Sequence, residues 1–266
     1  MGLGEDLSAA AVEARLPGRP VRSYPAVLST EADALAWARG GAPAGALVTA
    51  GYQAAPRGRA GLEWETQPDG ATAFSLVVRP RLPAEREGWL YTVATCALAD
   101  VAGGEAAIAW PDEVWRSGRR VAAAGVHAEL GPAGIAWAVV TVLLADARPP
   151  RAPLVARVVE AIEARLRAAS ADVLADYTPR CRTIGEAVRA RLVPLGPGGP
   201  EVTGTAVAAL KDGAVVLGTA EGRRVAVRPQ HLGRLDQPAT AADAASHAPP
   251  PGPAPARGGA PPGPAA

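Results

Sequence analysis

The spacing of apolar and polar residues changes along the chain, and each change predicts a different element. Apolar side chains recur every three to four residues across 83–101 and 151–169, which is the pattern of amphipathic helices. A shorter helix is predicted to begin at Ser29, whose hydroxyl suits an N-cap, and to reach about Arg39, before Gly40-Gly41. Strands are predicted where apolar residues alternate or run continuously, at 46–50, 72–79, 106–110, 120–130 and 135–144.

The two ends of the chain have patterns of their own. From Val188 onward, short apolar runs are separated by turn residues, and Asp212-Gly213 between two such runs is a strong hairpin signal. The predicted strands there are 202–210, 214–219 and 223–227. Proline, alanine and glycine dominate 236–266, so we expect disorder. Residues 1–22 hold one short helical pattern and two prolines, too little for a helix-turn-helix.

The composition narrows the class of protein. With 48% apolar residues among 266, the chain can bury one large domain, or one medium and one small. A net charge of +1 gives no general attraction to nucleic acid or to a membrane surface, and the longest apolar run, 135–145, is too short to span a bilayer. Two cysteines do not make a disulfide scaffold, and 1–6 lacks the apolar core of a signal peptide. We therefore expect a cytoplasmic protein.

His127 and Cys96, which lie in a predicted strand and a predicted helix, do not indicate a metal centre. His127 stands alone in a predicted strand, with no second histidine or cysteine near it in the sequence, so a resident metal site is not expected. Cys96 lies on the predicted helix 83–101, where a buried, unreactive thiol is the expected state.

The stretch from Tyr52 to Trp64 carries the strongest chemical signal. It lies between two predicted strands and holds Arg57 and Arg59 on either side of Gly58. Arginine presents a planar set of donors that suits phosphate or carboxylate, and glycine lets the backbone approach a ligand closely. Trp64 offers a flat surface on which a ring can stack. The stretch predicts a site for a nucleotide; the alternative is a solvated basic loop with the tryptophan in the core.

This stretch, Gln-x-x-x-Arg-Gly-Arg-x-Gly-x-x-Trp, resembles the glycine- and arginine-rich loop of the biotin protein ligase family. Four other segments resemble that family in the same order along the chain. Ser29-Thr30 stands at a predicted helix start, as the family's Ser-Thr pair does, and Trp110-Pro111-Asp112-Glu113 stands where the family has Lys-Trp-Pro-Asn-Asp. Ala124-Gly125-Val126 with Glu129-Leu130 resembles the family's Lys-x-Ala-Gly-Ile-x-x-Glu, and Tyr177 with 181–185 resembles its Tyr and Cys-Thr-Leu-Gly. The resemblance runs from about Val27 to Leu235.

The resemblance implies a fold and a division into domains. The expected fold class is α+β, a biotin/lipoate ligase-like catalytic domain with a mixed sheet and packed helices, followed by a small SH3-like β-barrel. The domain boundaries that follow are 1–22 for an N-terminal extension, 23–185 for the catalytic domain, 188–235 for the barrel and 236–266 for the tail.

The resemblance also implies a reaction. In that family the carboxylate of biotin attacks the α-phosphate of ATP with Mg²⁺ present, and the biotinyl-adenylate then biotinylates a lysine of a biotin carboxyl carrier protein. The family's pattern assigns three groups of residues: Arg57, Arg59 and Glu113 to catalysis, Ser29, Thr30, Gln53 and Gly125 to biotin, and Arg57, Gly58, Arg59, Trp64 and Asp112 to the nucleotide.

The chain departs from this pattern where the family has lysine, asparagine and glycine. Ala109 and Ala122 stand where the family has lysines, and 139–144 contains neither the family's glycines nor its asparagine. The single lysine of the chain, Lys211, lies in a predicted hairpin turn of the second domain and is not expected to replace them. Arg119 or Arg120 is expected to reach the site, but an arginine does not reproduce a compact ammonium at the same position. We therefore expect a ligase of weakened or altered activity, whose adenylation Ala122→Lys would raise. The alternative is a non-catalytic, nucleotide- or partner-binding protein on the same fold.

Overall fold

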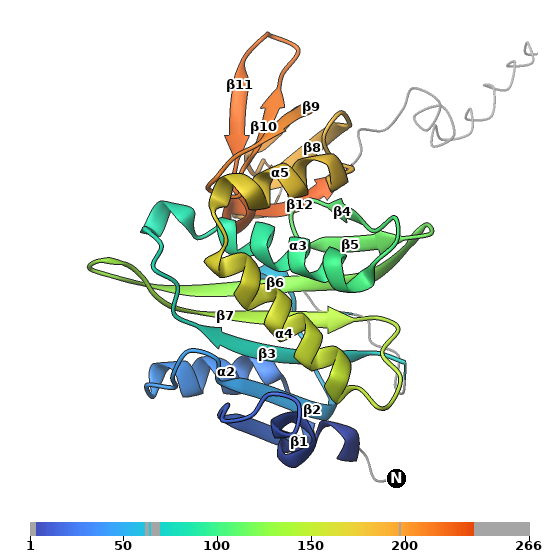
Figure 1. Ribbon diagram of the computed structural model, residues 1–266. Helices are drawn as coiled ribbons and strands as arrows, with labels where there is room; N and C mark the ends of the chain where they lie inside the picture. The colour runs from blue at the N-terminus through green and yellow to red at the C-terminus, as the bar shows by residue number, and fades with distance from the viewer. Residues whose placement is uncertain (1–3, 62–63, 65–69, 197, 237–266) are drawn as a thin grey trace, which may run out of the picture.

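The computed structural model describes residues 4–61, 64, 70–196 and 198–236, and these form two sheets with helices packed around the first (Figure 1). Apart from Asp236, the tail predicted to be disordered lies outside the described residues. Among the described residues, no helix combines the length and the apolarity that crossing a bilayer requires.

The first sheet has seven strands in the order β1-β2-β3-β7-β6-β5-β4. β1 and β2 pair in parallel and the remaining neighbours are antiparallel, so the predicted mixed sheet is confirmed. The strands are β1 (Val21–Val27), β2 (Leu47–Gln53), β3 (Thr72–Val78), β4 (Ala107–Ala109), β5 (Glu113–Arg116), β6 (Arg119–Gly131) and β7 (Gly134–Leu144).

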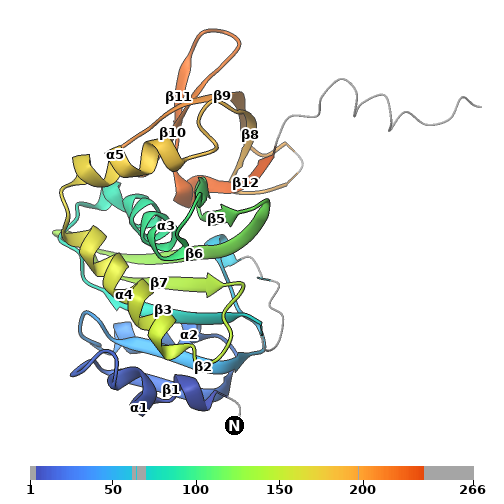
Figure 2. The same ribbon diagram turned by 45° about the vertical axis from the view of Figure 1, so that its right-hand side comes forward.

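Helices cover both faces of this sheet (Figure 2). On one face α2 (Thr30–Arg39) buries Ala34 and Ala38 against strand residues such as Val77, and Ser29 caps the helix as predicted. On the other face α3 (Trp89–Ala102) and α4 (Ala152–Arg167) pack against the apolar side chains of β3, β6 and β7. Alternate residues of each strand therefore point into two separate cores.

The first residues of the chain belong to the core. A 3₁₀ turn (Glu5–Leu7) and α1 (Ala9–Glu13) place Leu7 and Val12 fully inside it. The carboxylate of Asp6 accepts three hydrogen bonds from Arg151, from the backbone N–H at 2.7 Å and from the guanidinium at 2.9 and 2.7 Å. Both side chains are buried, so this ion pair ties the N-terminal segment to the start of α4.

After α5 (Ser170–Arg180) the chain forms a second, antiparallel sheet in the order β11-β10-β9-β8-β12. Its strands are β8 (Ala187–Leu192), β9 (Glu201–Ala209), β10 (Val215–Gly218), β11 (Arg224–Val227) and β12 (Leu232–Asp236). The edge strands β11 and β12 share no ladder within the described residues, so the sheet is open. It docks on the first sheet through a hydrogen bond of 2.9 Å from Trp110 Nε1 to the carbonyl of Gly213.

The backbones of Gly88 and Gly213 meet at the same contact. A Cβ placed on Gly88, just before α3, would lie 2.6 Å from the carbonyl oxygen of Asp212, and one on Gly213 would lie 2.1 Å from the carbonyl oxygen of Gly88. No side chain fits between the two segments, so main chain packs directly on main chain here.

Two strands of the first sheet were not predicted, and one helix begins later than predicted. β1 is an edge strand with Pro25 in it and no buried side chain, so it lacks the apolar alternation of an inner strand. β5 spans four residues, of which only Val114 is fully buried. The helix predicted from Pro83 begins at Trp89, because residues 84–86 form a separate 3₁₀ turn.

Candidate functional site

The glycine- and arginine-rich loop follows β2 and lies on the α2 side of the sheet. Its first residues continue the pairing with β1, since Ala54 N donates to the carbonyl of Val27 at 3.0 Å. Gly58 is packed between two neighbours, the indole of Trp64 and the backbone of Gly125. A Cβ on Gly58 would lie 2.1 Å from the indole nitrogen of Trp64, and a Cβ on Gly125 of β6 would lie 3.1 Å from the carbonyl carbon of Gly58. The loop reaches the sheet this closely because both positions are glycine.

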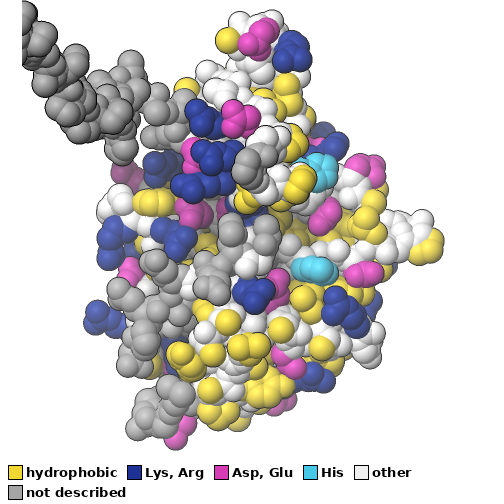
Figure 3. All heavy atoms as spheres, turned by 180° about the vertical axis from the view of Figure 1, so that it is seen from behind, with side chains coloured by type: hydrophobic (Ala, Val, Ile, Leu, Met, Phe, Trp, Pro, Cys, Tyr) yellow, Lys and Arg dark blue, Asp and Glu magenta, His cyan; other side chains and the backbone are white. Residues whose placement is uncertain are grey.

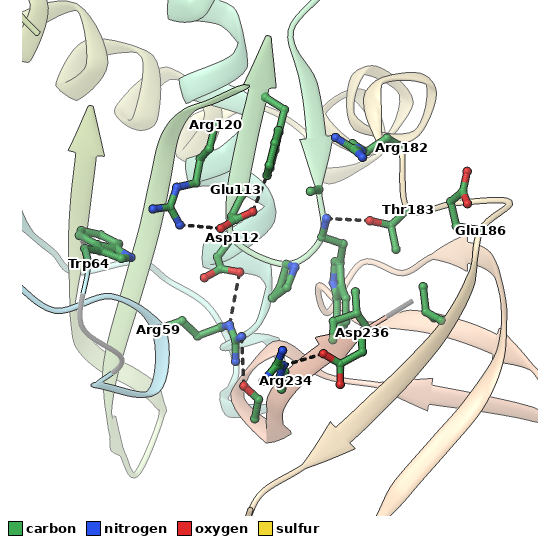
Figure 4. Close-up of a pocket in the computed structure, with 17 residues that line it drawn as sticks. Arg59, Trp64, Asp112, Glu113, Arg120, Arg182, Thr183, Glu186, Arg234 and Asp236 are labelled. Atoms are coloured by element: carbon green, nitrogen blue, oxygen red, sulfur yellow. Dashed lines mark hydrogen bonds and ion pairs between the residues drawn. The ribbon is translucent and has the colours of Figure 1, made fainter. Parts of the chain in front are cut away.

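Arg59 points from this loop toward the second sheet. Its side chain is buried and donates to the carbonyl oxygens of Leu232 and, at 3.4 Å, Gly233, both in β12. Its Nε also lies 3.4 Å from Oδ1 of Asp112, in the turn between β4 and β5 (Figure 4). The arginine therefore connects the loop, the edge of the first sheet and the second sheet.

A cavity of about 670 Å³ opens at this point, between the β4–β5 edge of the first sheet and the strands β8 and β12 of the second. Its lining includes four arginines, Arg59, Arg120, Arg182 and Arg234, and four acidic residues, Asp112, Glu113, Glu186 and Asp236. The indoles of Trp64, Trp110 and Trp115 add flat apolar surface. Charges of both signs with aromatic surface suit a ligand that carries anionic groups and a ring, as a nucleotide does.

The face opposite to that of Figure 1 shows a similar mixture of charges on a larger scale. Basic and acidic side chains intermix over its upper part, next to residues that are not described, whereas apolar side chains gather over its lower part (Figure 3). No single sign of charge covers this view, in keeping with the net charge of +1.

Asp112 is the acid of the cavity whose protonation is most perturbed. Burial raises the pKa of its carboxyl to about 6, because the charged form loses water, and the nearby Arg59 guanidinium opposes this shift. The carboxyl therefore gains its charge between about pH 5 and 7, within reach of a cation that stabilises it.

Glu113 is fully engaged by its neighbours. Its Oε2 accepts from Trp115 Nε1 at 2.9 Å, and its Oε1 accepts from a terminal guanidinium nitrogen of Arg120 at 2.8 Å. The resemblance implied a catalytic role for Glu113, as a carboxylate that orients a metal ion or a lysine. In the structure it holds an arginine and a tryptophan in place at the cavity wall.

Two of the four residues expected to bind biotin, Thr30 and Gln53, belong to a buried polar chain beneath α2. Oε1 of Gln53 accepts from the backbone N–H of Thr30 at 2.8 Å, and Nε2 of Gln53 donates to the carbonyl of Ala73 at 2.8 Å. The hydroxyl of Thr30 lies 3.0 Å from that of Ser75, which in turn lies 2.9 Å from that of Thr141. Ser75 and Thr141 were not singled out in the sequence, because single hydroxyls in strands carry no local signal.

Ala122 does not face the cavity. Ala123 of the same strand packs in one cluster with Trp64, whereas Ala122 lies in the core on the α3 and α4 side and is 2% exposed. Because neighbouring strand residues point to opposite faces, a lysine at 122 would enter that core. The expectation that Ala122→Lys restores a cation to the site is therefore wrong, and alanine at 122 bears neither for nor against activity.

The structure brings together part of the predicted site. Arg59, Trp64, Asp112 and Glu113 all line the cavity. Arg57 is exposed and does not line it; its charge acts instead on Glu31, whose pKa is raised by burial. The anion site that was expected to combine both loop arginines is not assembled in this structure.

Three arginines of the cavity, Arg120, Arg182 and Arg234, were not assigned to the site from the sequence. Arg120 had been named only as one of two cations able to reach it. Arg182 lies directly beside β4, where its backbone N–H donates to the carbonyl of Ile108 at 2.9 Å, whereas Arg234 comes from β12 of the second sheet.

The described residues contain no group of three or more His, Cys, Asp and Glu side chains placed to hold a metal ion. Mg²⁺ often binds through one or two carboxylates together with the phosphates of its substrate, so a single well-placed acid suffices. Asp112 is such an acid: it lines the cavity, and its carboxylate has the Arg59 guanidinium as an ion-pair partner at 3.4 Å.

The known proteins that this chain resembles agree with one another in family. No protein-family profile matches the chain. The biotin–acetyl-CoA-carboxylase ligase of Mycobacterium tuberculosis is 32% identical over 206 residues, which cover 67% of this chain and 75% of that protein. The biotin protein ligase from Aquifex aeolicus in complex with biotin and ATP has a TM-score of 0.63 at 19% identity, covering 82% of this chain and 99% of that one. The Helicobacter pylori biotin acetyl coenzyme A carboxylase synthetase with bound biotinylated ATP has a TM-score of 0.57 at 17% identity, covering 79% and 100%.

Proposed function

Because the chain belongs to the biotin protein ligase family, we propose that it activates biotin with ATP and transfers the biotinyl group to a lysine of a carrier protein. The observation that carries this proposal is the cavity, in which Arg59, Trp64 and Asp112 meet beside the loop that resembles the family's own. A guanidinium, an indole face and a carboxylate are the groups that recognise a phosphate, a base and a magnesium ion respectively.

The first step joins two anions, so the site has to offset charge. An oxygen of the biotin carboxylate forms a bond to the α-phosphorus of ATP as the bond from that phosphorus to the bridging oxygen of the β-phosphate breaks, and pyrophosphate leaves with the electron pair. Fixed cations lining the cavity lower the barrier by stabilising the charge that develops on the phosphate oxygens. Arg59 is placed to do so once a ligand competes for its bonds to the β12 carbonyls.

Mg²⁺ has a place in this proposal. The ion would be held by Asp112 together with the phosphates of the nucleotide, and it would withdraw charge from the reacting phosphate. The pKa of about 6 leaves the Asp112 carboxyl mostly ionised at neutral pH, which binding of a cation requires.

The biotin end of the substrate is assigned to the polar chain under α2. Thr30 and Gln53 present hydrogen-bonding groups at the base of the loop, with Ser29 beside them at the start of the helix and Gly125 under the loop backbone. Gly58 and Gly125 are in contact here, so entry of an acyl chain between loop and strand requires the loop to lift.

The second sheet is part of the proposal as well. We assign residues 188–235 to a small SH3-like barrel in an open form and residues 23–185 to the catalytic domain, with 1–22 packed onto it. The carrier protein would approach the mouth of the same cavity. Its lysine amine forms a bond to the acyl carbon of biotinyl-adenylate as the bond from that carbon to the phosphate oxygen breaks, and AMP leaves.

Arg59 also supports a second candidate function. Its donors are occupied by the carbonyls of β12 and its Nε lies by Asp112, an arrangement that suits a protein that binds a nucleotide or a partner without catalysis. Turnover separates the two functions, since binding alone releases no pyrophosphate.

The test combines calorimetry with a pyrophosphate assay. Titration of the full chain with ATP, with biotin and with biotinyl-adenylate should give tightest binding for the adenylate, because it contacts both ends of the site. Pyrophosphate should be released with ATP and biotin together and not with ATP alone. Binding without biotin-dependent release would establish the non-catalytic alternative, and the absence of both would refute any ligase-type site.

A further inference from the structure

We propose that Arg120 is a catalytic residue of this site and that Glu113 is the positioning residue that holds it. The inference rests on the proposed function and names a second cation, beside Arg59, that stabilises the charge on the reacting phosphate. Arg120 lines the cavity, its side chain is 31% exposed, and one carboxylate oxygen is its ion-pair partner. It is therefore both fixed and accessible to a ligand.

The other arginines of the cavity are less suited to this task. Arg59 is buried and bonded to the carbonyls of β12. Arg234 pairs with Asp236 at 2.6 Å, but its side chain is 69% exposed, so solvent screens its charge. Arg182 stacks over the ring of Trp115 at 5.1 Å and has no ion pair within the described part of the chain, so no carboxylate fixes its direction. A cation that is already oriented costs no reorganisation when the charge develops, and Arg120 meets this condition.

A β-bulge explains why Arg120 faces the cavity. Val114 of β5 pairs with Ala122 of β6, and the next residue, Trp115, pairs with Arg120, so Val121 is the extra residue. Without the bulge, Arg120 would share the core-facing side of Ala122, since residues two apart in a strand face the same way. The extra residue turns Arg120 to the side of Trp115.

The carboxylate of Glu113 then fixes the direction of the guanidinium. One of its oxygens holds Arg120 (Figure 4), and the other accepts from the indole N–H of Trp115. Ion pairing through one end of the guanidinium leaves the other donors of Arg120 for phosphate oxygens. The cation thus acts in the first step, without any proton transfer or redox change.

The neighbouring arginine provides a matched control. Arg119 precedes Arg120 in β6, but it is 73% exposed, pairs with Asp146 at 3.0 Å and does not line the cavity. Replacing either arginine by alanine removes the same charge from the same strand. Only the replacement at Arg120 changes the cavity.

The experiment measures biotin-dependent pyrophosphate release by the full chain, as kcat and as KM for ATP. Loss of one oriented donor to a developing charge typically lowers kcat by about a hundred- to a thousand-fold, so we expect that loss for Arg120→Ala, with partial recovery in Arg120→Lys. Arg119→Ala should stay within about twofold of the unaltered chain. Arg120→Gln, which keeps most of the side-chain volume without charge, serves as the second variant if Arg120→Ala does not fold.

Glu113→Gln tests the positioning role through non-additivity. It should lower kcat with little change in the affinity for ATP, and combining it with Arg120→Ala should cause no further loss, because Glu113 acts through Arg120. A purely structural role of Glu113 would instead lower kcat further in the double variant and would overturn the positioning assignment.

Two results separate this inference from the proposed function. If the unaltered chain releases pyrophosphate with biotin and Arg120→Ala keeps that rate, the role of Arg120 is refuted and the proposed function stands. If the unaltered chain binds no nucleotide and releases no pyrophosphate, the proposed function is refuted and the role of Arg120 with it.

Discussion

Ala122→Lys should destabilise the fold and leave adenylation unimproved. Ala122 is 2% exposed and lies in the core that β6 shares with α3 and α4. An ammonium in that apolar core would lose its water without gaining an ion-pair partner. The lysine should therefore be neutral, with its pKa lowered from its ordinary value of about 10.4.

The magnitude follows from the cost of removing the proton. At about 1.36 kcal/mol per pH unit, keeping a lysine neutral at pH 7 costs about 4–5 kcal/mol, and the larger side chain adds about 1–3 kcal/mol of overpacking. A typical domain has a free energy of unfolding of about 5–15 kcal/mol, so this substitution should remove a large part of it. Ala122→Met provides the matched control, because it brings a similar volume without the charge.

Urea unfolding at two pH values separates the two contributions. The unfolded lysine binds a proton that the buried lysine has lost, so the stability of Ala122→Lys should rise with pH, by about 1.4 kcal/mol per unit between pH 7 and 9 relative to Ala122→Met. If the lysine and methionine variants unfold at the same urea concentration at both pH values, the side chain reaches solvent or the cavity. The assignment of Ala122 to the core face would then be wrong.

Two further predictions follow from the ion pairs. Arg59→Ala should weaken ATP binding by about 1.5–3 kcal/mol, as expected for a lost hydrogen bond to a charged group, whereas Arg57→Ala, at an exposed position outside the cavity, should change it by about 1 kcal/mol or less in the same calorimetric titration. Asp6→Asn should lower the free energy of unfolding at pH 7 by about 3–5 kcal/mol, because it leaves Arg151 buried without its counterion. The hydrogen bonds from Arg151 lower the pKa of Asp6, so its contribution is present above the ordinary pKa of an aspartate and is lost as the pH falls through the lowered value. The difference between the two proteins should therefore shrink in acid, and an equal difference at pH 7 and pH 3 would contradict this account.

Elements that are marked by a local pattern of apolar and capping residues could be predicted from the sequence. The helix that Ser29 caps and the amphipathic α4 lie where the spacing of apolar residues placed them. Trp64 and Asp112 also converge on one cavity, as the order of the motifs implied. The signals of the two helices lie within a few turns, where periodicity and capping act, whereas the convergence of Trp64 and Asp112 follows from the order of the family's motifs.

The parts that sequence reasoning missed depend on pairing between distant segments. The bulge at Val121 exists only in the register of β6 with β5, and it decides that Arg120 and not Ala122 belongs to the site. The acceptors of Arg59 are backbone carbonyls of β12, and a carbonyl has no signature in a sequence. The short segment before the Ser117-Gly118 turn, β5, was not predicted as a strand, because four residues are too few to show a clear alternation.

The contact between Gly88 and Gly213 bears on how the second sheet could be exchanged between relatives. Two backbones that touch without side chains require glycine on both sides of the boundary, so a graft that brings any larger residue to either position cannot dock in this orientation. A chimaera would have to carry both glycines together, even though 125 positions separate them along the chain. Recombination at this junction is therefore constrained by main-chain shape, and a library of exchanged second sheets should be sorted first by whether the partner of Gly88 is a glycine.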